Sequence, residues 1–328
     1  MNAGALRPRR ARATAIKCAV TAGLLAWLLG RVDLRGIGAA LADARPAWVG
    51  AAFALHFVGL LLSAVRWRLL LRAQGAEAPL RFLAQSLLIG TFFNNFLPST
   101  VGGDLMRARD TTVHAGSGTG ALAVVLVERA SGILVLGFFA LAAPLAGALG
   151  HGAASAPATL AGSVLLVGFV ALVLLRRPRP LASLHRDVEK RRSAAVPGGK
   201  TAAVLAKVDT LLVTLEALAA APGTLRTTFL LALLLQANVI LHFWCVARSL
   251  SLGVSPGALL LVVPVATVLL LLPVSINGIG AREAVFGYLL GLYGVPLTEA
   301  IAFSWVAYGT VLGQGILGGV VYALRRNS

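Results

Sequence analysis

Two short stretches of the chain place charged residues directly after a proline and glycines within apolar sequence. The first runs from Phe96 to Arg107 and the second from Leu271 to Glu283. In each stretch, four residues separate a Leu-Pro pair from a glycine, and three more separate that glycine from an arginine. Proline removes a backbone donor and glycine permits a sharp turn, so the pattern predicts a break in each of two apolar helices.

The chemistry that such a break offers is anion binding. A helix that restarts after a break presents free N–H groups, and its N-terminus carries partial positive charge. An arginine beside that end gains nothing from the dipole, so Arg107 and Arg282 indicate an anionic ligand such as a phosphate held by both. In the alternative, both arginines serve only the fold, because charges inside a membrane are usually paired whatever their role. Arg107 would then pair with Asp104, and Arg282 with Glu283 or Glu128.

Further polar residues around the two breaks complete the predicted site. Acidic side chains would position the arginines or exchange a proton. Amides and hydroxyls would donate hydrogen bonds to a head group, although capping of helix ends is their commoner use. The predicted substrate-binding residues are Asn94, Asn95, Ser99, Asp104, Arg107, Glu128, Arg129, Asn277, Arg282 and Glu283. The predicted helix-breaking residues are Pro98, Gly102, Gly103, Pro273, Gly278 and Gly280.

The sequence carries no signature of catalysis. It has no His/Cys cluster with metal-ligand spacing, no Gly-x-Ser-x-Gly motif and no phosphate-binding loop. We therefore expect no metal, no cofactor and no enzymatic activity. Gln236, His242 and His56 lie within apolar runs, where we expect them to make ordinary interhelical hydrogen bonds. Cys18 and Cys245 also lie within apolar runs and are expected to be inert thiols.

The elements that must position these residues are membrane-spanning helices. The 328 residues are 58% hydrophobic and 12% charged, with a mean hydropathy of +0.86. Soluble domains carry about 25% charged residues and disordered chains have low hydrophobicity, so both classes are excluded. This length holds about six to eight spans. We predict an all-α polytopic integral membrane protein that forms one domain over residues 1–328.

Charge bias sets the predicted topology. The net charge is +17, and most cations lie between apolar runs, which is typical of cytoplasmic flanks rather than of nucleic-acid binding. Nine cations fall within the polar segment 176–207, which must therefore be cytoplasmic. If the N-terminus is cytoplasmic and every apolar run before residue 176 crosses the membrane, five crossings precede this segment and would place it outside, in conflict with its charge. The conflict disappears if 80–97 and 255–294 enter from opposite sides, break and return, as in an inverted repeat.

The predicted fold has six full spans and two re-entrant hairpins, with both termini cytoplasmic, in the bacterial inner membrane. The six predicted spans are residues 14–31, 47–71, 119–149, 157–175, 225–249 and 296–323. A cleavable signal is the alternative for the first run. Residues 207–221 are predicted to form an amphipathic segment that lies in the membrane interface. We expect the basic segment to face the anionic phospholipid surface, and the sequence implies no particular oligomeric state.

These residues resemble a known family. The stretch Phe93–Ser99, followed by Gly102–Asp104 and Arg107, resembles the first signature of the lysylphosphatidylglycerol synthase transmembrane (flippase-like) family. Its next block is matched by Glu128-Arg129 with Gly132, and its last by Leu272–Glu283 with Gly294 downstream. The pair Arg66-Trp67 also fits. The resemblance covers nearly the whole chain.

The resemblance implies a lipid flippase. In bifunctional members a membrane domain of this kind precedes an aminoacyl-transferase domain. This sequence ends at Ser328, so we expect no synthesis of lysylphosphatidylglycerol. Stand-alone members are associated with polyprenyl-linked sugar or hopanoid pathways, which leaves the lipid open. Two alternatives to transport are a lipid-modifying transferase with Glu128 or Glu283 as base, and a membrane scaffold of a lipid or envelope pathway.

Overall fold

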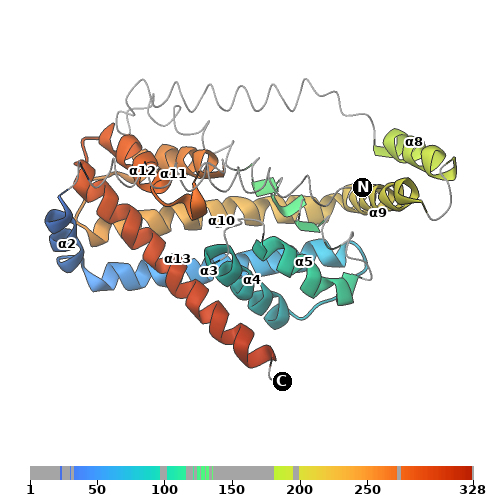
Figure 1. The fold of residues 1–328 in the computed structure, drawn as a ribbon, viewed down its shortest axis with the longest axis horizontal. Coiled ribbons are helices and arrows are strands. Elements are labelled where there is room, and N and C mark those ends of the chain that lie inside the picture. Colours follow the sequence, from blue (N-terminus) through green and yellow to red (C-terminus); the bar gives the residue numbers. More distant parts are fainter. Residues whose placement is uncertain are drawn as a thin grey trace.

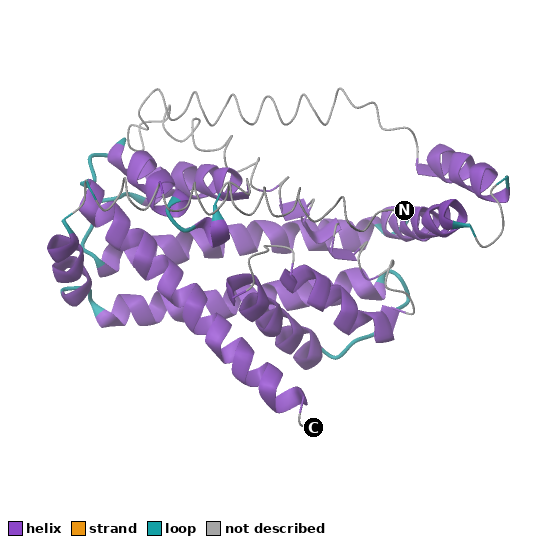
Figure 2. Cartoon of the chain, in the orientation of Figure 1, coloured by secondary structure: helices purple, strands orange, loops and turns teal. Residues whose placement is uncertain are grey.

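The computed structural model is a bundle of helices (Figure 1). It describes residues 33–96, 102–115, 181–194, 199–271 and 275–326, together with residues 23 and 30 and single positions between 121 and 135. Within these ranges the elements are α-helices and one 3-10 turn, and no strand occurs (Figure 2). The all-α prediction is confirmed for this part of the chain.

Three long helices form the frame of the bundle: α3 (Pro46–Arg72), α10 (Pro222–Ser249) and α13 (Leu297–Arg326). Each is apolar and longer than the roughly 20 residues that a crossing needs. Proline in the first turn starts both α3 and α10, where its missing N–H costs nothing. The α10 helix lies along α3, and α13 crosses the pair (Figure 1).

These helices correspond to three of the six predicted spans, residues 47–71, 225–249 and 296–323. The other three predicted spans lie outside the described residues, apart from single positions.

Hydrogen bonds from polar side chains join the three frame helices. The Asn238 Nδ2 donates to the Leu55 carbonyl at 3.0 Å, and the His242 Nδ1 lies 2.9 Å from the Ala52 carbonyl. The Gln314 Nε2 donates to the His56 carbonyl at 3.2 Å. The predicted interhelical role of His242 is therefore confirmed.

The first predicted break separates α4 (Leu80–Phe96) from α5 (Gly102–Ala115), which pack against each other. Gly90 and Gly103 form the contact point. A Cβ atom added to Gly103 would collide with the Gly90 carbonyl and with the Asn94 side chain. Pro98 and Ser99 lie outside the described residues.

The second predicted break separates α11 (Pro256–Leu271) from α12 (Ala281–Gly291). The 3-10 turn η1 (Ile276–Gly278) lies between them. Asn277, Gly278 and Gly280 have φ values of 52°, 75° and 78°, in the left-handed region that glycine tolerates best. Pro273 is outside the described residues. The helices on either side of each predicted break are separate elements, and the roles of the individual prolines and glycines stay a prediction.

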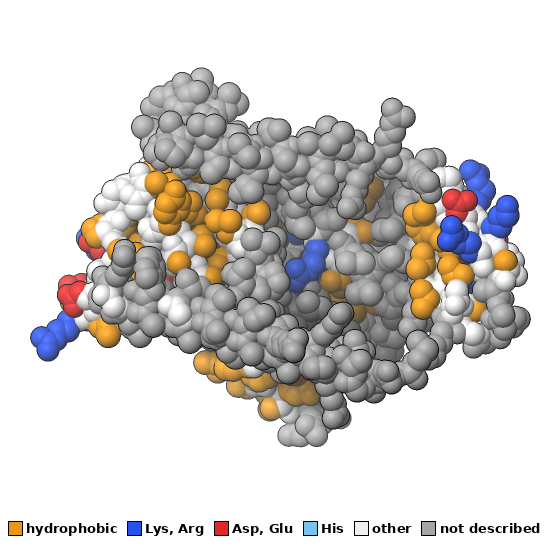
Figure 3. Space-filling model, turned by 45° about the horizontal axis from the view of Figure 1, so that its top comes forward, with side chains coloured by type: hydrophobic (Ala, Val, Ile, Leu, Met, Phe, Trp, Pro, Cys, Tyr) orange, Lys and Arg blue, Asp and Glu red, His pale blue; other side chains and the backbone are white. Residues whose placement is uncertain are grey.

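The polar segment 176–207 includes the helix α8 (Leu181–Ser193) and the start of the helix α9 (Lys200–Ala219). They form a hairpin at one end of the molecule, and α2 (Leu34–Ala42), α11 and α12 lie at the other end (Figure 1). Lys and Arg side chains gather on the end formed by α8 and α9 (Figure 3). The predicted interfacial segment 207–221 is the later part of a helix that already begins at Lys200.

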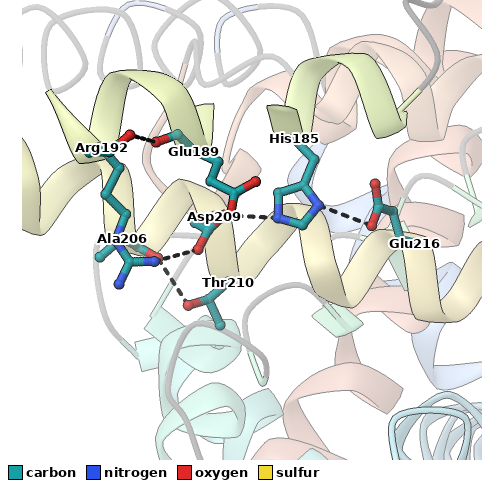
Figure 4. Close-up of polar contacts among 8 residues, drawn as sticks. His185, Glu189, Arg192, Ala206, Asp209, Thr210 and Glu216 are labelled. Atoms are coloured by element: carbon teal, nitrogen blue, oxygen red, sulfur yellow. Dashed lines mark hydrogen bonds and ion pairs between the residues drawn. The ribbon is translucent and has the colours of Figure 1, made fainter. Parts of the chain in front are cut away.

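Polar side-chain contacts join α8 to α9. The His185 ring lies between two acids of α9, with Nε2 3.0 Å from Asp209 and Nδ1 3.2 Å from Glu216 (Figure 4). Arg192 pairs with Asp209 at 2.6 Å. The two helices also bury the apolar side chains of Val188 and Leu212.

Two apolar clusters hold the bundle together. The larger joins α10, α11, α12 and α13 around the rings of Phe243, Phe286 and Phe303. The smaller surrounds the fully buried Trp67, where α3 meets α4. The α2 helix buries Ile37 against the start of α13.

Candidate functional site

A cavity of about 320 Å³ lies among α3, α4, α10, α11, α12 and α13. Most of its wall is apolar, as in ligand sites generally, and a few polar groups converge on it. Its polar lining residues are His56, Ser63, Thr91, Asn238, His242, Thr267, Arg282, Tyr308 and Gln314. None of the described residues that line it is an aspartate or glutamate.

Arg282 is the cation of this cavity, and it stands in the first turn of α12, directly after the break. Its Nη2 donates to the Asn277 carbonyl at 3.2 Å, and its guanidinium lies 3.9 Å from the centre of the Tyr308 ring. Its Nη1 is buried and has no hydrogen-bond partner among the described residues. A buried donor without a partner is costly, so this nitrogen is a candidate donor to a ligand.

Hydrogen bonds join the turn before α12 to the end of α4, so the two predicted break regions are in contact. The Asn277 Nδ2 donates to the Asn95 carbonyl at 2.8 Å, and the Asn95 Nδ2 donates to the Val311 carbonyl at 3.1 Å. The last turn of α4 is thereby held to the turn before α12 and to the middle of α13. Arg282 contacts this junction through its hydrogen bond to the Asn277 carbonyl.

Two of the predicted binding residues cap helices instead. The Glu283 carboxylate accepts the Gly280 N–H at 2.8 Å, at the start of α12. The Asn94 Oδ1 accepts the Gly103 N–H at 2.8 Å, at the start of α5. An acceptor at the N-terminus of a helix satisfies a free N–H group and favours the helix by about 1 kcal/mol.

Arg107 belongs to a second cluster. It forms a buried ion pair with Glu128, and its guanidinium lies 4.4 Å from the centre of the Trp67 ring. Arg66 donates to the Glu128 carbonyl at 3.1 Å and to the Ser131 Oγ at 2.8 Å. Arg107 is not one of the described residues that line the cavity.

The two arginines therefore have different neighbours, and Glu128 pairs with Arg107 and not with Arg282. Their joint binding of one phosphate stays a prediction. Arg129 is exposed beside Glu128. The side chain of Asp104 lies outside the described part of the chain, as does all of Ser99.

The cavity also contains residues that sequence reasoning did not assign to it. His56 and His242 were expected only to join helices, and Tyr308 and Gln314 were not singled out. The signal that could have found them is the presence of titratable and amide side chains inside long apolar helices, which marks a lined cavity as often as a helix contact.

Comparison with known proteins assigns the chain to a family. Residues 14–318 match the family described as "Lysylphosphatidylglycerol synthase TM region". The chain belongs to this family. The match includes both helix breaks, the cavity and the Arg107–Glu128 cluster, so the resemblance predicted from the signature residues is confirmed. No curated protein and no solved structure gives a significant match.

Membership in the lysylphosphatidylglycerol synthase membrane-region family and the three long apolar helices identify an integral membrane protein. The family points to a lipid or envelope pathway.

Proposed function

We propose that this member of the family moves an anionic lipid, a phospholipid or a polyprenyl-phosphate-linked lipid, between membrane leaflets without changing its covalent structure. The lipid phosphate would bind in the cavity beside Arg282. One observation carries the proposal: Arg282 lines a cavity with no acid in its described lining, and one of its guanidinium nitrogens is buried without a hydrogen-bond partner among the described residues. Guanidinium and phosphate form strong charge-assisted hydrogen bonds, often in pairs.

The size of the cavity supports a lipid whose head group lies inside the cavity and whose acyl chains lie outside it. A cavity of about 320 Å³ is at the small end of ligand sites and too small for a whole lipid. Large apolar side chains are exposed along α10 and α13, among them Leu234, Leu241, Ile316 and Val320. Such surfaces suit acyl chains or the surrounding bilayer.

The arrangement of the broken helices supports two opposed re-entrant hairpins. The α4–α5 pair lies toward the α8–α9 end of the molecule, and the α11–α12 pair lies at the opposite end (Figure 1). The Asn277–Asn95 hydrogen bond joins them where they meet. Broken helices that meet at the centre of an inverted repeat are where transporters place their substrate.

The end that carries α8 and α9 would be cytoplasmic, and both termini would lie on that side of the bacterial inner membrane. Four cations of α8 are exposed: Arg186, Lys190, Arg191 and Arg192. Arg72 ends α3, and Arg325 and Arg326 end α13. This bias follows the positive-inside rule, and it would bring the α8–α9 hairpin close to anionic phospholipids.

The test is lipid transport in proteoliposomes. Fluorescent phosphatidylglycerol is incorporated, and its transfer between leaflets is followed by dithionite quenching. We expect Arg282→Gln to slow transfer at least about tenfold, which corresponds to an increase of roughly 1.4 kcal/mol in the activation free energy of transfer. The matched control is Arg226→Gln, which removes an exposed cation from the start of α10.

Equal rates in both variants would refute the role of Arg282. A change in the mass of the recovered lipid would instead favour a transferase. No transfer by the wild-type protein, for this lipid or for lipids that copurify with it, would favour a scaffold.

A further inference from the structure

Two histidines face each other in the wall of the cavity. His56 of α3 and His242 of α10 have ring centroids 5.2 Å apart, and both rings line the same space as Arg282. Imidazole is the side chain whose charge changes near neutral pH. The pair therefore brings a titratable group into a site that already holds a fixed positive charge.

The tautomer of His242 follows from its hydrogen bond. Its Nδ1 lies 2.9 Å from the Ala52 carbonyl, and a carbonyl oxygen only accepts, so Nδ1 carries the hydrogen. The Nε2 of the neutral ring then has a free lone pair. This nitrogen is the one that gains a proton when the ring becomes charged.

The charged groups around the two histidines determine under which conditions the pair gains a proton. Arg282 on α12 and Tyr308 on α13 are the charged and titratable groups that line the cavity with it among the described residues. The described lining residues from α4 and α11 are uncharged: Leu87, Thr91, Thr267 and Leu270. The nearest acid along α12, Glu283, is held by the Gly280 N–H and does not line the cavity.

A proton on the pair would thus add a second positive charge to the cavity that Arg282 lines. Like charges in one poorly solvated cavity repel each other. An anion in the cavity reverses the sign of that interaction, because it attracts both cations.

We infer that the cavity binds an anion together with a proton, and that the imidazole pair of His56 and His242 holds the proton. The inference rests on the proposed function and adds its coupling ion. The proton comes from water and forms an N–H bond at the His242 Nε2 or on the His56 ring. It returns to water when the anion leaves. One proton is shared by the pair, since two would restore the repulsion.

Thermodynamic linkage between proton binding and anion binding gives the direction in which the affinity changes with pH. If binding takes up a proton, affinity falls as pH rises, by at most tenfold per pH unit for one proton. The same linkage lets a proton gradient drive the loaded cavity in one direction.

The experiment is calorimetric titration of the purified protein with dihexanoyl phosphatidylglycerol below its micelle concentration. Its phosphodiester keeps one negative charge from about pH 5 to 9, so any proton taken up binds to the protein. Titrations at pH 7.5 in buffers of different ionisation enthalpy count the protons. We expect an uptake of about 0.5 to 1 proton per lipid, and an affinity at least about threefold weaker at pH 8.5 than at pH 6.5.

The double variant His56→Gln/His242→Gln is expected to bind with no proton uptake and with an affinity independent of pH. The control is His185→Gln in the α8–α9 hairpin, which should behave as the wild type. If the double variant does not fold, His56→Gln alone is measured. It leaves the His242–Ala52 bond in place, and an unchanged pH dependence there would overturn the assignment to the pair.

The two proposals fail differently. Binding that requires Arg282 but takes up no proton overturns the proton site and leaves the proposed function standing. Uptake that persists in the double variant also overturns it. Binding that is absent, or indifferent to Arg282→Gln, overturns the proposed function and the proton site together.

Discussion

At the scale of single residues, the Arg107–Glu128 pair and Arg282 show two different uses of buried arginine. Arg107 has an acidic partner and an aromatic ring against it, and these satisfy its charge within the fold. Arg282 has an aromatic ring and a carbonyl, and it forms no ion pair with an acid among the described residues. The first arrangement is typical of a structural ion pair and the second of a ligand site.

This difference predicts the effect of Glu128→Gln. The change removes the carboxylate that pairs with Arg107 but leaves the carbonyl that Arg66 binds. Removal of one member of a buried ion pair costs about 3–5 kcal/mol, so the variant should unfold at a clearly lower temperature in detergent. The double variant Arg107→Met/Glu128→Met should recover much of this loss. A single variant as stable as the wild type would contradict the structural role of the pair.

At the scale of elements, the α4–α5 pair depends on the close approach of two glycines. A methyl group on Gly103 would strike the Gly90 carbonyl and the Asn94 side chain, which caps α5. We expect Gly103→Ala to lower the free energy of unfolding by about 1–3 kcal/mol, the usual cost of overpacking.

The matched control for Gly103→Ala is Gly50→Ala in α3, where an added Cβ meets nothing within 4 Å. Alanine favours a helix over glycine by about 0.5–1 kcal/mol, so this variant should be as stable as the wild type or more so. Equal effects of the two changes on thermal unfolding would show that α4 and α5 do not pack through Gly103.

Some of these elements are readable from sequence and others are not. The frame helices α3, α10 and α13 follow from hydropathy and length, because each needs only its own residues to be apolar. The breaks follow from proline and glycine, which act locally. The α8–α9 hairpin does not, because ion pairs such as Arg192–Asp209 join positions whose partnership no local pattern fixes.

The cavity was predictable only in part, for the same reason. Arg282 is marked by the break that precedes it. His56, His242 and Gln314 reach the same space from three helices, and their convergence is a property of packing. The two arginines share a sequence pattern, yet the tertiary structure gives them different partners.

At the scale of the whole molecule, the proposed topology places the α8–α9 end in the cytoplasm and the start of α13 outside. In a background without Cys18 and Cys245, a cysteine at the exposed Ser193 should react with an impermeant maleimide only from the cytoplasmic side. A cysteine at the exposed Glu299 should react only from the outside. Labelling of intact spheroplasts and of inverted vesicles measures both. Reaction of both positions from the same side would overturn the proposed orientation.

The ring of Tyr308 under Arg282 has a consequence for the resting protein. An empty anion site with a bare guanidinium would be poorly stable, and a carboxylate there would compete with every incoming ligand. The Tyr308 ring stabilises the guanidinium less than a carboxylate would, because a cation–π contact contributes only about 0.5–2 kcal/mol. In the proposed function, the ring would be a weak substitute for the phosphate: it would stabilise the arginine when no lipid is bound and would yield readily to a phosphate.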